Sequence, residues 1–479
     1  MAIDEFSIPS HVLDYIKARG YEVSTSMTSA ITQWYRWYTS DVEHDGDAKD
    51  FYNIEYKSGK ARKARKRMSL KPARRACREW ASLLLDEETE VATDGSNANE
   101  WLEDYLERTS FWVNGQEMVE TAFAIGTGAW ALWFDVDDDG TSIKLRTYDA
   151  RMIVPLSWDM DGVTECAFVT RIVLKGKPAD QLQIHRLSEP DESGEGGGTY
   201  VIETAMFIDA KKVNPEEYDV LEEFDTGCAT PTFGIVRPGI KNIVADQSPY
   251  GQSVFHDGID TIKAVDIAWD AIFQEVDLTK VMVFLDEALI DVRDENGRAI
   301  PVQGDDQKVR KVYGSSSSDF YEVYSPDIRI DPLVKALDTA LAEYGDQMGF
   351  GQDYFTLDKA GGLKTATEVS ADNSQMMRNV KKHENALGSA ISQVLTALLT
   401  CARIHCGAQI EEEFGAVVVK FDDSIIEDTA AKKNMMLAEI AAGVVPVWKY
   451  LVEFYGMSKE EAMEAVAAQA PEEPPELGF

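Results

Sequence analysis

The chain has 479 residues, of which 44% are hydrophobic, and 84 acidic residues against 47 basic ones give it a formal net charge of -37. Such a charge repels nucleic acid on average, so any contact with DNA must be local. The cysteines (Cys77, Cys166, Cys228, Cys401 and Cys406) show no CxxC spacing, which argues against a disulfide or zinc framework and predicts core thiols. The N-terminus lacks the features of a signal peptide and no apolar run approaches the roughly 20 residues of a membrane helix, so we expect assembly in the cytoplasm and no membrane contact.

The N-terminal part is predicted to be helical and then strongly basic. Residues 10 to about 40 have helical spacing, with an aromatic face formed by Ile31, Trp34, Tyr35 and Tyr38. The basic stretch, residues 57–78, includes Arg62, Lys63, Arg65, Lys66 and Arg67. It indicates either a phosphate-contacting patch or a solvated strip that pairs with acidic residues of this chain or of a neighbouring subunit. No aromatic residues interleave for base stacking. Further helices are expected at residues 71–85 and 98–123.

Residues 129–236 change to alternation and short β-rich runs separated by turn clusters, which predicts an antiparallel β-rich unit. Within it, Asp135, Asp137 and Asp139 match the first half of an EF-hand calcium loop. Calcium needs a bidentate Glu at the twelfth position, where Arg146 stands, and no helix is expected on either side. We therefore predict an acidic hairpin turn, with weak metal binding as the alternative. Residues 159–162 are predicted to form a similar turn.

Two amphipathic helices are predicted to flank a compact β insert. The first runs from about 251 to 278 with the stripe Ile262, Val265, Trp269, Ile272 and Val276. The chain then has β character from residue 280, and a second helix begins at Asp331-Pro332, an N-cap residue followed by Pro at the first helical position. Its stripe is Leu333, Leu337, Leu341, Tyr344 and Met348. The pattern predicts a stalk with a β tip.

The second helix leads into a Gly-rich loop, residues 349–364, and then a long helix from Thr365 towards Gly407. Thr365 and Glu368 have the spacing of a capping box. The apolar stripe continues past Gly388, so the helix would span roughly 60 Å at about 1.5 Å per residue. Its first half is mostly polar and its second half apolar, which predicts that one end is buried and the other meets water or another subunit.

The C-terminal part is predicted to hold a strand at 416–421 and helices at 428–442, 447–455 and 458–468, the last capped by Ser458 and Glu461. The Pro- and Glu-rich residues 471–479 are predicted to be disordered.

The sequence contains no signature of an enzyme. Its six histidines are scattered without an HExxH pair, and it has no GxSxG elbow, phosphate-binding loop or dinucleotide fingerprint. We expect no cofactor, no metal and no catalytic residue.

Several segments, in this order, resemble tailed-bacteriophage portal proteins. Ser248-Pro249-Tyr250-Gly251-Gln252-Ser253-Val254-Phe255 and the following helix resemble the entry to the stem of those proteins. Lys364-Thr365-Ala366-Thr367-Glu368-Val369 resembles the motif that opens their long wing helix, and Ala442-Gly443-Val444-Val445-Pro446 resembles part of their C-terminal end. Together the similarities cover residues 71–468.

The resemblance implies an α+β, mainly helical fold whose copies form a ring, usually a dodecamer, at one capsid vertex of the virion. It assigns a wing (1–250), two stem helices (251–278 and 327–348) and a clip between them (279–326). The remaining parts are a tunnel loop (349–364), a long wing helix with a strand (365–424) and a crown with a disordered tail (425–479). The resemblance implies that double-stranded DNA passes through the ring. An acidic channel suits this passage, because a channel wall that lets DNA of any sequence through should not bind its phosphates.

The resemblance also implies partners and contact residues. The partners are other copies of the chain, double-stranded DNA bound without sequence specificity, the terminase large subunit, a head-tail adaptor, and major capsid and scaffold proteins. The loop residues expected to face DNA are Gln352, Asp353, Lys359 and Lys364. The clip surface expected to dock partners contains Arg293, Asp294, Glu295, Arg298, Lys308, Arg310 and Lys311.

Two alternatives remain open. One is another virion component such as an adaptor ring, which is typically much shorter and lacks two paired helices around a β insert. The other is an acidic metal-dependent hydrolase that uses Asp135, Asp137 and Asp139.

Overall fold

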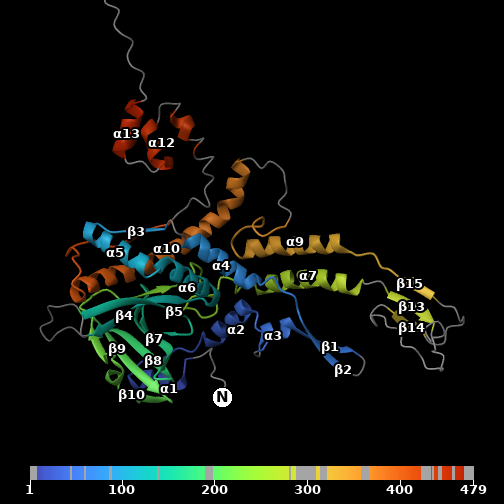
Figure 1. Ribbon diagram of the computed structural model, residues 1–479, viewed down its shortest axis with the longest axis horizontal. Helices are drawn as coiled ribbons and strands as arrows, with labels where there is room; N and C mark the ends of the chain where they lie inside the picture. Colours follow the sequence, from blue (N-terminus) through green and yellow to red (C-terminus); the bar gives the residue numbers. More distant parts are fainter. Residues whose placement is uncertain are drawn as a thin grey trace, which may run out of the picture.

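The computed structural model (Figure 1) describes most of the chain. The described residues are 8–43, 46–58, 61–85, 89–137, 140–188, 198–279, 282–286, 309–312, 321–357, 366–421, 433, 436–440, 445–455 and 459–468.

Helices and strands both contribute, and more of the described residues lie in helices than in strands. The helices are α1 (Ser10–Ala18), α2 (Thr28–Thr39), α3 (Asp47–Tyr52), α4 (Pro72–Leu84), α5 (Ser96–Arg108), α6 (Phe111–Ile125), η1 (Pro215–Tyr218), α7 (Ile259–Leu278), α9 (Ile330–Gln347), α10 (Ala366–His405), α12 (Val447–Tyr455) and α13 (Lys459–Ala468). The strands outside the β-rich unit of residues 128–236 are β1 (Asn53–Ser58), β2 (Ala61–Lys66), β3 (Glu90–Ala92), β13 (Met282–Asp286), β14 (Val309–Val312), β15 (Tyr321–Tyr324) and β16 (Val418–Lys420).

Two helices predicted from the sequence are each broken in two. The segment 10–40 forms α1 and α2, and Gly20 lies between them at a φ of 92°, a conformation in which only glycine is unstrained. The segment 98–123 forms α5 and α6, which are separated at Ser110, a residue with a φ of 51°. Of the predicted aromatic face, Ile31 and Trp34 are buried and Tyr35 and Tyr38 are partly buried, while Trp37, which the prediction omitted, is also buried.

The predicted β-rich unit is confirmed and consists of two antiparallel sheets. One follows the order β10-β9-β8-β7-β6 with β11 beside β9, and the other follows β12-β4-β5. The strands are β4 (Gly128–Asp137), β5 (Gly140–Asp149), β6 (Ile153–Trp158), β7 (Val163–Leu174), β8 (Lys177–Leu187), β9 (Tyr200–Ile208), β10 (Lys211–Val213), β11 (Glu223–Asp225) and β12 (Phe233–Val236). The predicted turn at 159–162 is present, because the Asp159 N–H donates to the Gly162 carbonyl at 2.9 Å.

The long helix is confirmed as α10, and its second half is the centre of the core. Ile391, Val394, Leu395 and Leu398 are fully buried, and the helix packs on β12, β4 and α4. The segment Gln375–His405 is long and apolar enough to cross a membrane, but 56% of its most apolar window is buried inside the protein. The apolar character of α10 is therefore explained by the core that it forms.

Four cysteines are buried as predicted, whereas Cys406 is exposed because it follows the last residue of α10.

The predicted pair of helices around a β insert is present as α7, the strands β13 to β15, and α9 (Figure 1). The predicted cap is wrong in detail: α9 begins at Ile330, Arg329 takes the N-cap position, and Asp331 lies in the first turn. Strand β13 is central in the insert, with β14 parallel on one side and β15 antiparallel on the other.

Several predictions fall on residues outside the described set. These are the capping residues Thr365 and Ser458, and the C-terminal segment 471–479. Of the predicted helix at 428–442, residues 433 and 436–440 are described, and they are helical.

Candidate functional site

The paired helices α7 and α9 are joined at both ends. At the end near the β insert, Arg329 donates from its backbone N–H and its Nε to Glu275 Oε1 at 3.1 and 3.0 Å, and from Nη2 to Oε2 at 2.9 Å. These bonds lower the pKa of Glu275 below its ordinary value. At the other end the Thr261 hydroxyl donates to Gln347 Oε1. The two contacts fix one antiparallel register. The two helices therefore pair along their length, as predicted for the stalk.

The stalk continues into the predicted loop through a tight turn at Gly345. The N–H groups of Phe350 and Gly351 both donate to the Gly345 carbonyl, at 2.9 and 3.1 Å. A Cβ added to Gly345 would collide with the Gly351 carbonyl oxygen. Gly349 adopts a φ of 87° between them. Glycine is therefore required by close backbone approach at Gly345 and by a left-handed conformation at Gly349.

The first part of the loop is held by aromatic side chains of α4 and α9. Phe350 stacks on Trp80 with ring centroids 4.3 Å apart, and Phe355 packs on Tyr344 at 4.8 Å. Trp80 Nε1 donates to the Met348 carbonyl at 3.1 Å, and the Tyr354 hydroxyl donates to Glu79 at 3.0 Å. Residues 349–357 are consequently anchored to the core.

Helix α10 contacts the same junction. Asn379 Nδ2 donates to the Gly349 carbonyl at 3.0 Å. One turn further, the His383 ring lies 4.7 Å from Trp80 and 4.9 Å from Phe123, and its Nδ1 accepts the Gly239 N–H at 2.9 Å. Burial, with a contribution from Lys382, lowers the pKa of His383 to about 4. The loop, α4, α9 and α10 thus meet at one packed junction.

The four loop residues predicted to face DNA are divided by the structure. Gln352 and Asp353 are exposed on the anchored segment, while Lys359 and Lys364 lie outside the described residues. Leu357, at the end of the described segment, is 58% exposed and its N–H donates to Asp338 at 2.7 Å. The DNA-facing role of these residues stays a prediction.

The residues predicted for docking at the β insert are mostly outside the described set. Arg310 and Lys311 lie on β14, paired in register with Phe284 and Leu285 of β13. Arg293, Asp294, Glu295, Arg298 and Lys308 are not among the described residues.

The predicted basic patch forms a two-stranded hairpin, β1–β2, which the sequence did not reveal. Arg65 and Arg67 are partly buried, and Arg65 binds Asp270 of α7 through two bonds of 2.8 and 2.7 Å. Arg62, Lys63 and Lys66 are exposed. Arg65 therefore anchors the hairpin to α7, whereas Arg62, Lys63 and Lys66 form an exposed basic surface.

Two carboxylates on α7 were missed by the sequence reasoning. Asp266 is fully buried and accepts bonds from Tyr52, Ser69 and Leu70. Burial raises its pKa in spite of these bonds. For Asp270, burial also acts to raise the pKa, but the bonds from Arg65 and Met68 lower it overall. A weak signal existed, since both residues stand one turn apart beside the apolar stripe of α7.

Asp135 lies in β4, opposite Ser142 of β5, so the acidic segment connects two antiparallel strands, as predicted, rather than two helices. Asp135 pairs with Lys144 and accepts the Trp133 Nε1–H at 2.5 Å. The described residues hold no group of three or more side chains suited to a metal ion. Asp138 and Asp139 are outside them.

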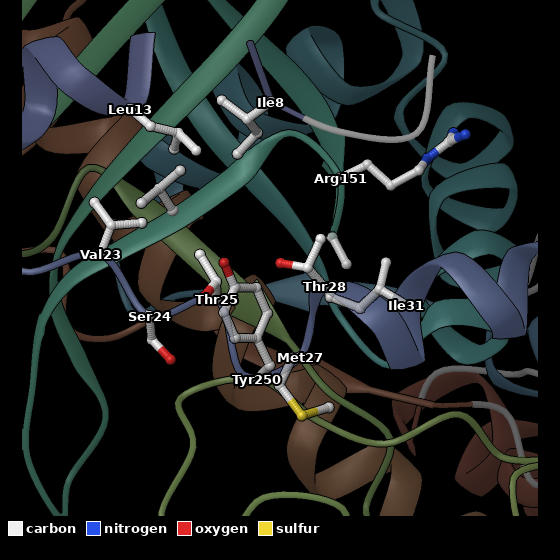
Figure 2. A pocket seen from close by; sticks show the side chains of 12 residues that line it. Ile8, Leu13, Val23, Ser24, Thr25, Met27, Thr28, Ile31, Arg151 and Tyr250 are labelled. Carbon is white, nitrogen blue, oxygen red and sulfur yellow. The ribbon is translucent and has the colours of Figure 1, made fainter. Parts of the chain in front are cut away.

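An apolar cavity of about 160 Å³ lies between α1, α2 and the start of β6. Figure 2 shows Leu13, Val23 and Tyr250 around it and the Arg151 guanidinium directed away from Tyr250. Arg151 is bound to Asp149 at 2.6 Å and lies over the Tyr35 ring. The residues that line the cavity do not include those of the loop junction, and the Tyr250 hydroxyl donates to the Ile153 carbonyl at 2.7 Å.

Comparison with known proteins identifies the chain. A sequence model of phage portal proteins matches residues 24–474. The chain is therefore a structural protein of the phage portal class. Within that class it belongs to the family described as "Phage portal protein, SPP1 Gp6-like". No curated protein sequence matches it.

Two solved structures are similar to the chain. "Neck of native GTA particle computed with C12 symmetry" shows 11% identity and a TM-score of 0.38, and covers 84% of this chain and 91% of that chain. "Neck of empty GTA particle computed with C6 symmetry" shows 10% identity and a TM-score of 0.40, and covers 79% of this chain and 88% of that chain.

Proposed function

We propose that copies of this chain form a closed ring of twelve at one capsid vertex, and that double-stranded DNA passes through the ring during packaging and ejection. The observation that carries the proposal is the match to the portal family over residues 24–474. The paired helices α7 and α9 support it, because they provide a rigid stalk that can pack side by side around an axis. The ring needs no catalytic residue of its own, since a separate motor moves the DNA.

Each part has a proposed role. Helices α7 and α9 form the stem, and the insert 279–326 is the clip that binds the terminase large subunit and later the head-tail adaptor. Residues 349–364 narrow the channel, with Lys359 and Lys364 touching phosphates transiently. Major capsid and scaffold proteins contact the outside. The net charge of -37 supports this arrangement, because an acidic wall does not retain DNA.

Imaging of the purified protein tests the ring. We expect negative-stain class averages of closed rings with a central hole, and mass photometry peaks at multiples of the 53.3 kDa chain mass. A monomer under every condition, including capsid assembly, would refute the proposal.

Charge reversal tests the loop. Lys359→Glu with Lys364→Glu should impair DNA packaging and leave the rings intact, while Lys359→Arg with Lys364→Arg, which keeps the charge, should package normally. If ring formation fails instead, the loop is an assembly element and its assignment to the channel is wrong.

A further inference from the structure

We propose that the outward face of the β1–β2 hairpin binds an acidic surface on a second copy of this chain. The inference rests on the proposed ring and adds a specific contact between its subunits. Four observations on the described residues carry it: a rigid mount, a solvent-exposed ribbon, a cationic face and the charge of the rest of the chain.

The mount is the set of hydrogen bonds that holds the hairpin on α7, both where the chain enters β1 and where it leaves β2. At the entry, the Tyr52 hydroxyl donates to Asp266 at 2.7 Å. At the exit, Arg65 binds Asp270 with two bonds, and the Met68 and Leu70 N–H groups donate to Asp270 and Asp266 at 3.1 and 2.9 Å. Both carboxylates are buried. The direction of the hairpin is therefore set relative to the stalk.

Beyond this mount the hairpin projects from the body. In Figure 1, β1 and β2 extend obliquely towards the same side of the molecule as α7, away from the sheets formed by β4 to β10. They form a sheet of their own, with no other strand paired to either edge among the described residues. A two-stranded hairpin is marginally stable alone in water. A hairpin that is rigidly held and whose outward side chains Lys57, Arg62 and Lys66 are exposed is suited to bind another surface, because its ordering cost is already met.

The two faces of the hairpin differ. Side chains alternate along a strand, and opposite residues in an antiparallel pair share a face. Arg65 points to α7, so Lys63 shares its inward side, whereas Arg62 and Lys66 lie on the outward side. Lys57 is opposite Arg62 and joins that outward side. Lys57, Arg62 and Lys66 are exposed and form no ion pair with any other described residue. Glu55 is the acidic residue of this face.

The charge of the chain identifies the partner. A protein with 84 acidic residues presents an acidic surface to its neighbours, and a ring of such subunits needs cationic contacts to offset their repulsion. The same net charge repels DNA from the hairpin on average. A second copy is therefore favoured over nucleic acid, and DNA becomes an outcome of the test.

The first experiment compares matched charge reversals. Arg62→Glu with Lys66→Glu reverses the outward face, and Lys177→Glu with Lys211→Glu makes the same charge change at exposed lysines of the wing. We expect the outward variant to need a roughly tenfold higher concentration for ring assembly, and the wing variant to assemble as the wild type does. Circular dichroism and thermal unfolding of the monomers check that both variants fold.

The second experiment detects the contact directly. Unlabelled and ¹⁵N-labelled monomers are mixed, assembled and treated with a carbodiimide, which couples lysine amines to carboxylates. We expect mixed-isotope peptide pairs that join Lys57 or Lys66 to an acidic residue of another copy, and we expect high salt to reduce their yield.

The outcomes are distinct. If the outward variant assembles as the wild type does and mixed-isotope pairs are absent, the inference is refuted while the proposed ring stands. Rings that form normally but lose DNA binding with the outward variant would assign the face to DNA and also refute it. A wild-type chain that never forms rings would overturn the proposed function itself.

Discussion

Two buried histidines predict that the folded protein loses stability in mild acid. His383 accepts the Gly239 N–H at its Nδ1 and is 4% exposed. His185 is fully buried, with its Nδ1 2.7 Å from the Thr232 hydroxyl. Burial lowers the pKa of His185 to about 3 and that of His383 to about 4, from 6.5. A proton on His383 Nδ1 would also break its bond to Gly239.

The sign and size follow from proton linkage. The folded state keeps both rings neutral. Their contribution to the unfolding free energy is therefore fully present above the unfolded pKa of 6.5, and it is lost as pH falls towards the folded pKa of about 4 for His383 and about 3 for His185. At about pH 5 the unfolded chain binds a proton on each ring and the folded chain mostly does not, which costs about 2 kcal/mol per histidine. The pair together costs about 4 kcal/mol, a large part of a typical folding free energy of about 5–15 kcal/mol.

Urea unfolding of wild type, His185→Gln, His383→Gln and the double variant measures the effect. Glutamine keeps a hydrogen-bond acceptor but does not titrate. Between about pH 7.5 and about pH 5, the wild type should lose about 4 kcal/mol more of its unfolding free energy than the double variant, and each single variant should recover about 2 kcal/mol. All samples share one protein concentration, because assembly shifts apparent stability.

Carboxylates also titrate in this range, but they are common to all four proteins and cancel in the comparison. The reasoning is refuted if the double variant loses as much stability in acid as the wild type. That result would mean that the two rings are protonated in the folded state without penalty.

Two substitutions test the supports of the hairpin and the loop. Asp270→Ala removes the acceptor of Arg65 and of the Met68 N–H. We expect the unfolding free energy to fall by about 3 kcal/mol and amide hydrogen exchange in residues 53–66 to become faster. The control Asp260→Ala, at an exposed position of α7, should change neither quantity. Gly345→Ala gains up to about 1 kcal/mol of helix propensity but forces the Gly351 carbonyl away at a cost of about 1–3 kcal/mol, so the unfolding midpoint should fall. An unchanged or raised midpoint would contradict the close contact.

The sequence predicted the elements in which an apolar stripe repeats over many residues and only one face of the element is buried. Helix α10 and the α7 and α9 pair were found because their apolar stripes repeat over many turns and lie in the core or against each other. Strands β4 to β12 were found as a β-rich unit because alternation and turn residues mark them. Breaks at Gly20 and Ser110 were missed, because helical spacing continued on both sides and only the backbone conformation shows the interruption.

The sequence predicted where the loop after α9 begins, but it did not predict the aromatic contacts that anchor the loop to the core. The prediction was a Gly-rich loop at residues 349–364, and it did not reveal that Phe350, Tyr354 and Phe355 anchor its first residues on Trp80 and Tyr344. The partner of Phe350 could not be identified from the sequence, because Trp80 belongs to α4, far away along the chain. Tertiary contact of this kind leaves no local periodicity.

The basic stretch shows why composition alone misjudges a surface. Ile54 and Tyr56 are the large apolar side chains of β1, and β2 has none, so the alternation is too short to mark these segments as strands and the basic residues were interpreted as one patch. The structure divides them by strand face: Arg65 supports the mount on Asp270, while Arg62 and Lys66 face outward. Neutralising the whole stretch would release the hairpin from α7 and alter its outward face in one step. Changing one face at a time is therefore the only way to separate folding of the hairpin from its contact with another subunit.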